Sequence, residues 1–332
     1  GRIGKGGDGM KNLMQSFAVL FGKDPVKADQ SEMTKKTIAE HKRKTELRGA
    51  ELSQHIKAER HKKFHSPQKW RRKRWISIIV VNLLFVLSYR LDLQLVEGAL
   101  TASRFVGFHM ADLNSALQVT LAFKQILINL VIGVVTVFIV WWLLGGRTFC
   151  SWICPYHILS EWAELIHLKL SPKVSWIKHH DFDRRARFVL WLVFAVLAYV
   201  TGYTVYETIS PTGILSRALV YGPSVILLWV LALLVFEVFY SRRFWCRYAC
   251  PIGLTYGLVG ATAPLKIKHD LRKCFNDGAC RKVCLVPHVL HSTKKGAAVK
   301  LNTELGADCT RCGRCIDVCP TGALSFKFKV GK

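Results

Sequence analysis

Four cysteines near the C-terminus have the spacing of iron–sulfur ligands. The run "CTRCGRCIDVCP" holds Cys309, Cys312 and Cys315 with two residues between neighbours, then Cys319 after three more, followed by proline. In bacterial two-cluster ferredoxins the first three cysteines of such a run bind one 4Fe–4S cluster, and the fourth binds the other. The run therefore predicts one 4Fe–4S site and a second site that shares Cys319.

The upstream stretch "CFNDGACRKVC" matches that second site except at Asp277, which stands where a cysteine would fall. Counting the two runs together predicts two ligand sets: Cys274, Asp277, Cys280 and Cys319 for cluster A, and Cys284, Cys309, Cys312 and Cys315 for cluster B. A carboxylate is a harder ligand than a thiolate, so we expect a labile iron at Asp277 and a 3Fe–4S form of cluster A. Two alternatives stay open: Asp277 faces water beside a three-iron cluster, or cluster A is absent.

The other four cysteines form a repeated motif. Arg-x2-Cys-x3-Cys-Pro occurs with Cys150 and Cys154, and again with Cys246 and Cys250. Residues i and i+4 share a helix face, and the following proline interrupts a helix. Two such pairs side by side would form a four-thiolate site. Its occupant stays open between a further cluster, a soft metal such as Cu(I) and a thiol relay, with buried structural cysteines as the bland alternative.

Apolar segments near the ~20 residues of a membrane-spanning helix come before the ferredoxin run. They cover 75–89, 126–144, 188–206 and 223–240. Lys and Arg gather before the first segment and between the second and third, which predicts cytoplasmic termini and clusters. We therefore expect an all-α four-helix membrane unit of two repeated hairpins, followed by a small α+β two-cluster ferredoxin-like domain. The expected location is the bacterial inner membrane, with several spans.

The expected domains are a basic N-terminal extension (1–74), helical or partly disordered, the membrane domain (75–260) and the ferredoxin domain (261–332). A net charge of +26 accompanies 51% hydrophobic residues. Nucleic-acid binders share such a charge but not the long apolar runs, so we expect no nucleic-acid partner. We expect the basic extension to contact a lipid surface.

Glu237 is an isolated carboxylate in the last apolar segment, which makes it a candidate proton acceptor. His157 and Glu161 follow Cys154 closely and are expected at a similar depth. These three residues form the predicted site for a quinol and its protons.

The motifs "GRTFCSWICP" and "RRFWCRYACP", with the paired ferredoxin runs, resemble the NapH-type membrane ferredoxins, in the wider group that includes NosR and CcoG-like proteins. The likeness covers about residues 70–328. It implies a quinol dehydrogenase subunit that draws on the membrane quinone pool. The implied partners are a NapG-type iron–sulfur protein and a c-type cytochrome, on a route towards periplasmic nitrate or nitrous oxide reductase.

Three departures from the family pattern stand out: Asp277, Leu285 in place of proline, and a longer basic segment over 10–70. The leading hypothesis is iron–sulfur electron transfer from quinol. Its rivals are a copper-reducing, metal-handling factor resembling CcoG, and an anchor or scaffold with structural clusters.

Overall fold

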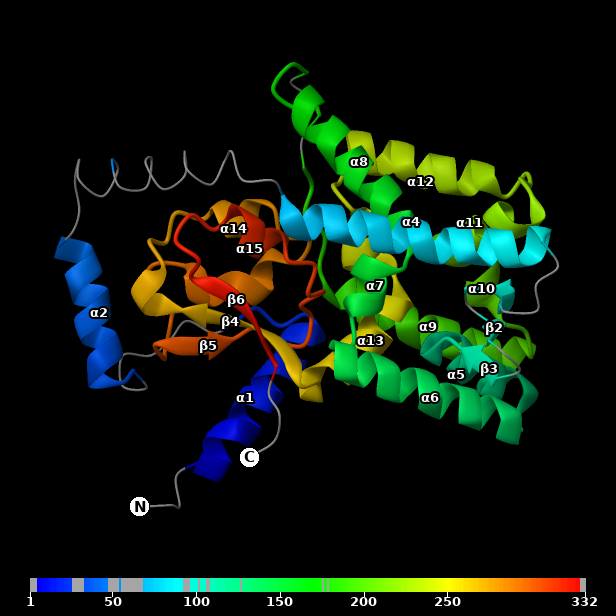
Figure 1. Ribbon diagram of the computed structural model, residues 1–332, viewed down its shortest axis with the longest axis horizontal. Helices are drawn as coiled ribbons and strands as arrows, with labels where there is room; N and C mark the ends of the chain where they lie inside the picture. The colour runs from blue at the N-terminus through cyan, green and yellow to red at the C-terminus, as the bar shows by residue number, and fades with distance from the viewer. Residues whose placement is uncertain are drawn as a thin grey trace.

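The chain forms a helical body beside a smaller unit that contains a sheet (Figure 1). The computed structural model describes residues 5–25, 33–46, 54, 68–91, 96–100, 102–105, 108–125, 127–174, 176–177 and 179–328. The helical body contains α4 (Lys69–Arg90), α5 (Leu113–Phe123), α6 (Ile128–Leu144), α7 (Thr148–Trp152), α8 (Pro155–Leu170), α9 (Arg185–Thr201), α10 (Val205–Ile209), α11 (Pro211–Tyr221), α12 (Leu227–Phe239), the π-helix η2 (Trp245–Ala249) and α13 (Pro251–Thr262).

The smaller unit follows α13 and carries both ferredoxin runs. Its elements are β4 (Leu265–Asp270), η3 (Leu271–Lys273), α14 (Ala279–Lys282), η4 (Pro287–Thr293), β5 (Asn302–Glu304), α15 (Arg314–Val318) and β6 (Leu324–Phe328). Strand β4 lies between β5 and β6 in an antiparallel sheet, with Ile267 opposite Phe326. The short helices α14 and α15 pack on each other beside this sheet. We call this part the ferredoxin unit.

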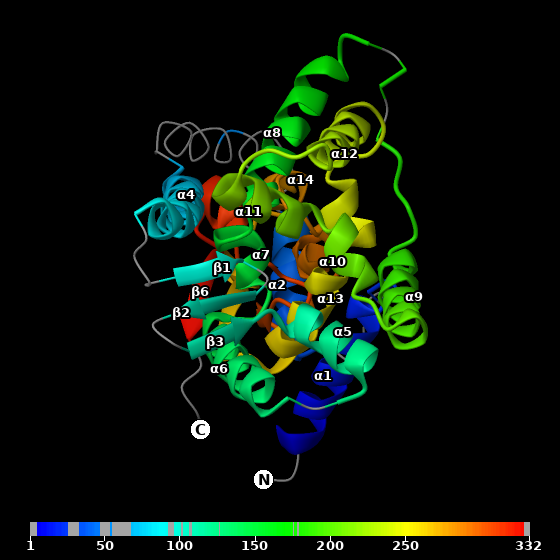
Figure 2. The same ribbon diagram turned by 90° about the vertical axis from the view of Figure 1, so that its right-hand side faces the viewer.

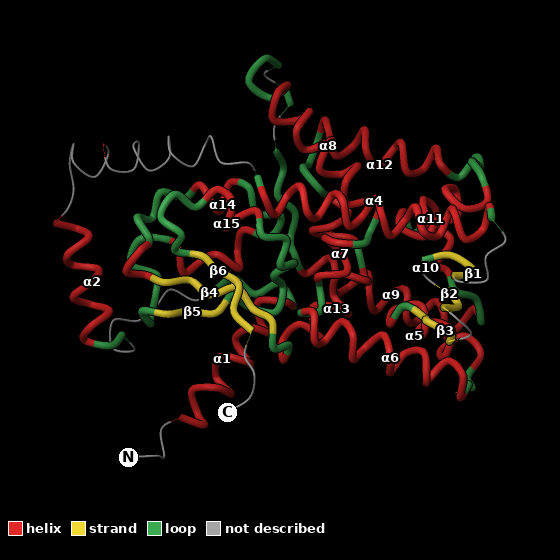
Figure 3. The backbone as a smooth tube through the Cα atoms, viewed as in Figure 1, coloured by secondary structure: helices red, strands yellow, loops and turns green. Residues whose placement is uncertain are grey.

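A second antiparallel sheet corrects the expectation that residues 75–260 are all α-helical. It consists of β1 (Val96–Ala99), β2 (Ala102–Phe105) and β3 (Phe108–Ala111). Figure 3 places this sheet at the far end of the helical body, away from the ferredoxin unit. The chain doubles back twice between α4 and α5, so the backbone groups of this loop bond to one another.

Within the described residues, no helix is both long and apolar enough to cross a membrane. The prediction of a four-helix membrane unit is therefore wrong, and so is the multi-pass inner-membrane location that depends on it. Helices α6 and α9 are each 17 residues long and end at Gly145 and Gly202, which have positive φ angles. Helix α12 has 13 residues, and α4 has 22 but opens with the charged stretch "KWRRKR". Three of the four apolar segments, 126–144, 188–206 and 223–240, are thus longer than the helices α6, α9 and α12 that they form.

Large apolar side chains are exposed on α4, α6, α9 and α12. Ile79 on α4, Ile132 on α6 and Val196 on α9 are examples, each more than half exposed. Helix α8 packs on α12, and α5 packs on α9 (Figure 2). The buried sides of these helices enclose the core that holds the repeated cysteine motifs.

The described parts of the N-terminal extension, α1 (Lys5–Leu20) and α2 (Lys35–Glu46), contact the rest of the chain. Leu20 is buried against α13, and Ser16 Oγ accepts a hydrogen bond of 2.7 Å from the Ala307 backbone N–H. Helix α2 reaches the ferredoxin unit through Lys44, whose ammonium donates to the Cys274 carbonyl at 2.6 Å. In this extension, which was expected to be helical or partly disordered, α1 and α2 are helical. Most of its remaining residues lie outside the described ranges.

Candidate functional site

The residues predicted for cluster A line one cavity of about 300 Å³ in the ferredoxin unit. The set is Cys274, Asp277, Cys280 and Cys319. The backbone N–H of Asn276 donates to Cys274 Sγ at 3.4 Å, and that of Ala323 donates to Cys319 Sγ at 3.3 Å. Iron–sulfur proteins use such N–H donors to set the reduction potential. The lining therefore suits a cluster with three thiolate corners and one carboxylate.

The residues predicted for cluster B lie together deeper in the same unit. Cys284, Cys309, Cys312 and Cys315 are all buried. Burial raises the pKa of the Cys315 thiol well above its usual value, and the other three thiols of the set raise it further because they lie near it. Four buried thiolates this close together would repel one another unless a bound cation neutralised their charge. This arrangement therefore fits a 4Fe–4S cluster.

Each ligand loop turns through left-handed backbone before a short helix. Asn276 (φ 59°) and Gly278 (φ 75°) precede α14, and Arg311 (φ 50°) and Gly313 (φ 73°) precede α15. The two loops therefore have matching shapes, as the paired ferredoxin runs lead one to expect. Gly313 is also crowded, because a Cβ placed on it would lie 2.7 Å from the Cβ of Trp70.

We expect Gly313→Ala to destabilise the ferredoxin unit more than Gly322→Ala does. Both glycines have positive φ (73° and 65°), but a Cβ on Gly322 would meet nothing within 4 Å. The left-handed conformation costs alanine about 1–2 kcal/mol at either site. The contact with Trp70 adds about 1–3 kcal/mol at Gly313 alone. Denaturant unfolding of both variants measures the difference, and equal losses would show that Trp70 does not crowd this loop.

The four cysteines of the repeated motif line a single cavity of about 390 Å³, which we call the four-thiol cavity. Its cysteines are Cys150, Cys154, Cys246 and Cys250. The Cys154 sulfur lies 3.2 Å from Thr212 Oγ1, and the Cys250 sulfur lies 3.6 Å from Tyr206 Oη. Both hydroxyl residues come from the α10–α11 region, which the sequence did not single out.

The cysteines of each pair do not share one helix face, contrary to the sequence-based interpretation. Cys150 lies in α7 and Cys246 in η2, whereas Cys154 and Cys250 precede the first residues of α8 and α13. Pro155 and Pro251 begin those helices, and a residue before proline is pushed out of the helical region. The ψ angles of 119° at Cys154 and 111° at Cys250 show this directly. The prolines thus turn the second thiol of each pair into the cavity.

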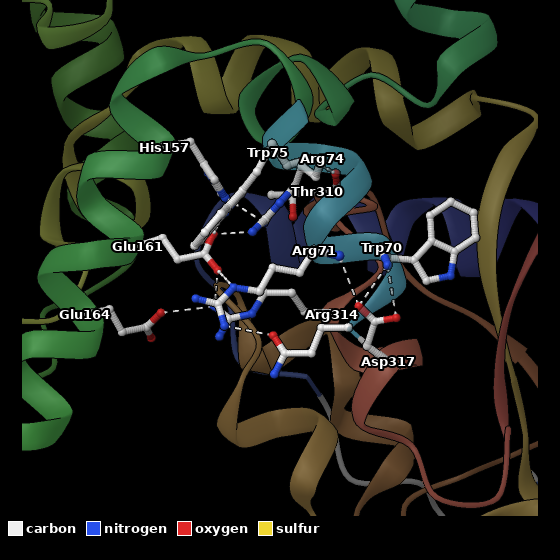
Figure 4. A network of polar contacts seen from close by, with 12 residues as sticks. Trp70, Arg71, Arg74, Trp75, His157, Glu161, Glu164, Thr310, Arg314 and Asp317 are labelled. Carbon is white, nitrogen blue, oxygen red and sulfur yellow. Dashed lines mark hydrogen bonds and ion pairs between the residues drawn. The ribbon is translucent and has the colours of Figure 1, made fainter. Parts of the chain in front are cut away.

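His157 and Glu161 belong to a buried ion network beside the cavity (Figure 4). Arg74 of α4 donates to Glu161 and, at 2.9 Å, to His157 Nε2. Arg71 Nε lies 3.1 Å from Glu161 Oε1. Arginines from three elements hold the pKa of Glu161 below its usual value despite burial. Glu161 is therefore a fixed anion, which disfavours its predicted use as a proton acceptor.

The basic end of α4 contributes to this network. Asp317 accepts hydrogen bonds from the backbone N–H groups of Trp70 (3.1 Å) and Arg71 (3.1 Å). A carboxylate placed there satisfies the unpaired donors of the first helical turn. The charges of this stretch were interpreted as a membrane-topology signal, but Arg71 and Arg74 pair with Glu161 of α8 in the structure. The backbone N–H groups at the start of α4 join it to α15.

Glu237 is completely buried and lies near the four-thiol cavity. Its carboxyl group accepts hydrogen bonds from Ser160 Oγ at 2.6 Å and from the Trp245 backbone N–H at 3.1 Å. It also interacts with Tyr156, a residue that lines the cavity. Burial raises the pKa of Glu237 to about 7, so the group can both take and release a proton near neutral pH.

A second buried ion group joins the cavity to cluster B. Asp308 accepts from Arg147 and, at 2.8 Å, from Arg187, while His288 Nε2 lies 2.7 Å from its other oxygen. Arg147 also donates to the Asp308 carbonyl at 2.9 Å. Sequence reasoning recorded Arg147 as part of the repeated motif and as a charge of the basic loop between the second and third apolar segments, and it missed Asp308. Asp308 directly precedes the predicted ligand Cys309, and this position could have marked it as a candidate site residue.

A row of glycines on α13 leaves room for the side chains of Arg147 and of Arg311 from the ferredoxin unit. A Cβ on Gly253 would lie 2.9 Å from Arg147 Nη2, and one on Gly260 would lie 2.9 Å from Arg311 Nη1. Close packing of the ferredoxin unit on α13 therefore depends on the absence of side chains along this helix face.

Among the described residues, no three or more His, Cys, Asp or Glu side chains are grouped closely enough to bind a single metal ion.

Comparisons with family models and with curated proteins both match this chain to iron–sulfur proteins. A family model described as a 4Fe-4S binding domain matches residues 126–173 and 221–272, and a second model of the same description matches 307–325. The first match falls twice, once on each Cys-x3-Cys-Pro motif. This supports the internal repeat found in the sequence.

The curated relatives are ferredoxin-type proteins. Ferredoxin-type protein NapH of Haemophilus influenzae is 30% identical over 199 residues, covering 60% of this chain and 68% of that protein. Methylamine utilization ferredoxin-type protein MauN is 31% identical over 268 residues in Methylobacillus flagellatus and 32% over 269 residues in Paracoccus denitrificans. Each match covers 79% of this chain and 92% of the relative. No solved structure matches significantly.

Proposed function

Because the chain belongs to the NapH and MauN group of ferredoxin-type proteins, which are iron–sulfur electron-transfer proteins, we propose that it takes its electrons from a quinol. When bound, its 4Fe–4S clusters accept and pass on single electrons. Oxidation of one quinol to the quinone releases two electrons and two protons. The clusters would carry the electrons away one at a time, and a buried carboxylate would take the first proton and release it to solvent before it takes the second.

The observation that carries the proposal is the position of Glu237 beside the four-thiol cavity. It combines complete burial, a contact with the cavity residue Tyr156 and a pKa near 7. Glu161 and His157 hold other roles here. Glu161 stays charged within its arginines, and burial and those arginines lower the pKa of His157 well below its usual value. Glu237 is therefore the proton acceptor in this proposal, and the other two are positioning residues.

The proposed acceptor is an iron–sulfur protein of NapG type or a c-type cytochrome. The NapH relatives and the family resemblance suggest a nitrate or nitrous oxide reductase system, whereas the MauN relatives are named for methylamine utilisation. The proposal therefore specifies the donor and the carriers, not the terminal reaction. We do not propose the copper-handling or scaffold alternatives, because no observation favours them.

Reduction by a short-chain quinol tests the proposal. Anaerobically purified protein is mixed with the quinol, and the loss of cluster absorbance is followed, with dithionite reduction as the measure of total clusters. We expect Glu237→Gln to be reduced about 100-fold more slowly by quinol, because general bases contribute about 10²–10⁴-fold. Dithionite should reduce both proteins equally.

The pH dependence separates proton transfer from a packing effect. The carboxylate form accepts the proton, so the wild-type rate should rise with pH through about 7, while Glu237→Gln should lack this rise. Glu304→Gln, a partly exposed residue paired with Lys266, is the control and should match the wild type. If quinol fails to reduce clusters that dithionite reduces, the quinol proposal is wrong.

A further inference from the structure

We propose that the four-thiol cavity holds a third 4Fe–4S cluster, bound by Cys150, Cys154, Cys246 and Cys250, and that it is the entry point for electrons on their way to cluster B. The inference deepens the proposed function and rests on it for the direction of electron flow. The assignment of the cluster itself rests on the shape, chemistry and neighbours of the cavity.

The cavity has the ligand number of a cubane site. Four thiols from two separate helix hairpins converge on it, and the family model described as a 4Fe-4S binding domain matches both hairpins. A cubane is larger than a single ion and keeps its thiolates further apart. The absence of a single-ion ligand group among the described residues is compatible with this spacing.

Three other residues of the lining carry hydrogen-bond donors that have no acceptor among the described residues. His157 Nε2 faces the guanidinium of Arg74, which can only donate, so the ring proton of His157 lies on Nδ1. That Nδ1 is buried and has no partner among the described residues, and the same holds for Trp245 Nε1 and Arg147 Nε. All three residues line the cavity. Unpaired buried N–H groups are costly. The sulfides and thiolates of an anionic cluster are the acceptors that they lack.

The position of the cavity connects it to cluster B. Leu285, the residue after the predicted ligand Cys284, is buried and forms part of the cavity wall. Cys246 packs against the core of the ferredoxin unit. Arg147 lines the cavity and donates to the carbonyl of Asp308, the neighbour of Cys309. Electrons that enter at the four-thiol cavity would therefore pass to cluster B next, and then to cluster A.

Iron content and EPR of the full-length protein, purified anaerobically and reconstituted with iron and sulfide, test the third cluster. We expect Cys150→Ser/Cys246→Ser to contain about four fewer irons per chain than the wild type, the content of one 4Fe–4S cluster. The EPR signals of clusters A and B should remain, which also shows that the variant is folded. Unchanged iron content in this variant would overturn the proposal. So would copper in place of iron, if the wild type retains it on desalting and the variant does not.

A milder variant covers the case in which the double variant does not fold. Trp245→Phe keeps the ring packing and removes one N–H donor. Hydrogen bonds to cluster sulfur raise the reduction potential, so one centre should move to a lower potential while the iron content stays constant. No shift at any centre would contradict the placement of the cluster against Trp245. If iron is lost in the double variant as expected but quinol reduces none of the centres, the third cluster stands and the quinol donor is wrong.

Discussion

Asp308→Asn is expected to lower the free energy of unfolding by about 3–5 kcal/mol, the loss found when one partner of a buried ion pair is removed. Asp308 is 2% exposed and lies between Arg147, Arg187 and His288. Its removal leaves two buried guanidinium groups without a counter-charge. Because Asp308 joins the helical body to the loop of cluster B, we also expect cluster B to be lost on reconstitution. Chemical denaturation and EPR measure the two effects.

The pH dependence of stability gives a second measurement on the same residue. The buried arginines hold the pKa of Asp308 well below its usual range. A carboxyl group with a depressed folded-state pKa stabilises the protein fully above its unfolded-state pKa of about 4. That contribution is lost as the pH falls below this value, so the wild type should lose more stability on acidification than Asp308→Asn does.

Asp24→Asn is the matched control for this pair of experiments. Asp24 also forms an ion pair with an arginine, Arg184, at 2.7 Å, but its side chain is 96% exposed. Exposed ion pairs of this kind contribute little or nothing measurable. Equal effects at Asp24 and Asp308 would show that burial does not determine the strength of these contacts.

Asp277→Cys is expected to convert cluster A from a form that loses one iron to a stable 4Fe–4S cluster. Asp277 lines the cavity of about 300 Å³ together with three cysteines. Its carboxylate is a weaker partner for iron than a thiolate, so the wild type should show a 3Fe–4S EPR signal after brief exposure to air. The variant should keep its full iron content and show only 4Fe–4S signals under the same treatment.

The reciprocal variant is the control. Cys312 occupies, in the downstream run, the position that Asp277 occupies upstream. Cys312→Asp should therefore make cluster B lose one iron as cluster A does in the wild type. If Asp277→Cys leaves the wild-type spectrum unchanged, Asp277 is not an iron ligand and the three cysteines hold cluster A without it.

The grouping of the ferredoxin residues was accessible from sequence because ligand spacing is a local property. A loop that carries cysteines every third residue can place them around one cluster whatever surrounds it. The fourth cysteine of each run follows the same count, and the structure brings Cys319 to the cavity of Cys274 and Cys280. The repeat of Arg-x2-Cys-x3-Cys-Pro likewise indicated a common site, and all four thiols line one cavity.

Hydropathy was misleading about the helical body because it measures composition along the chain and not where helices end. The segment 188–206 was taken to be near the length of a span, but its helix α9 ends at Thr201, where Gly202 caps it. Glycine adopts the left-handed conformation that closes a helix without a Cβ penalty. The end of α9 was thus decided by its cap.

The tertiary structure alone decided the charges around the sites. Glu161 and Glu237 are both carboxylates close to the repeated motifs, yet the first is surrounded by arginines and the second by a serine hydroxyl, a backbone N–H and a tyrosine. The partners of Glu161 come from α4, α15 and the segment before η2, far apart in sequence. The pKa of a buried group depends on which charges the fold brings within a few ångströms. The sequence by itself grouped the thiols, because local spacing links the ligands within each ferredoxin run and a repeat at an offset of 96 residues links the other four. The fold determined which neighbouring carboxyl group can exchange a proton.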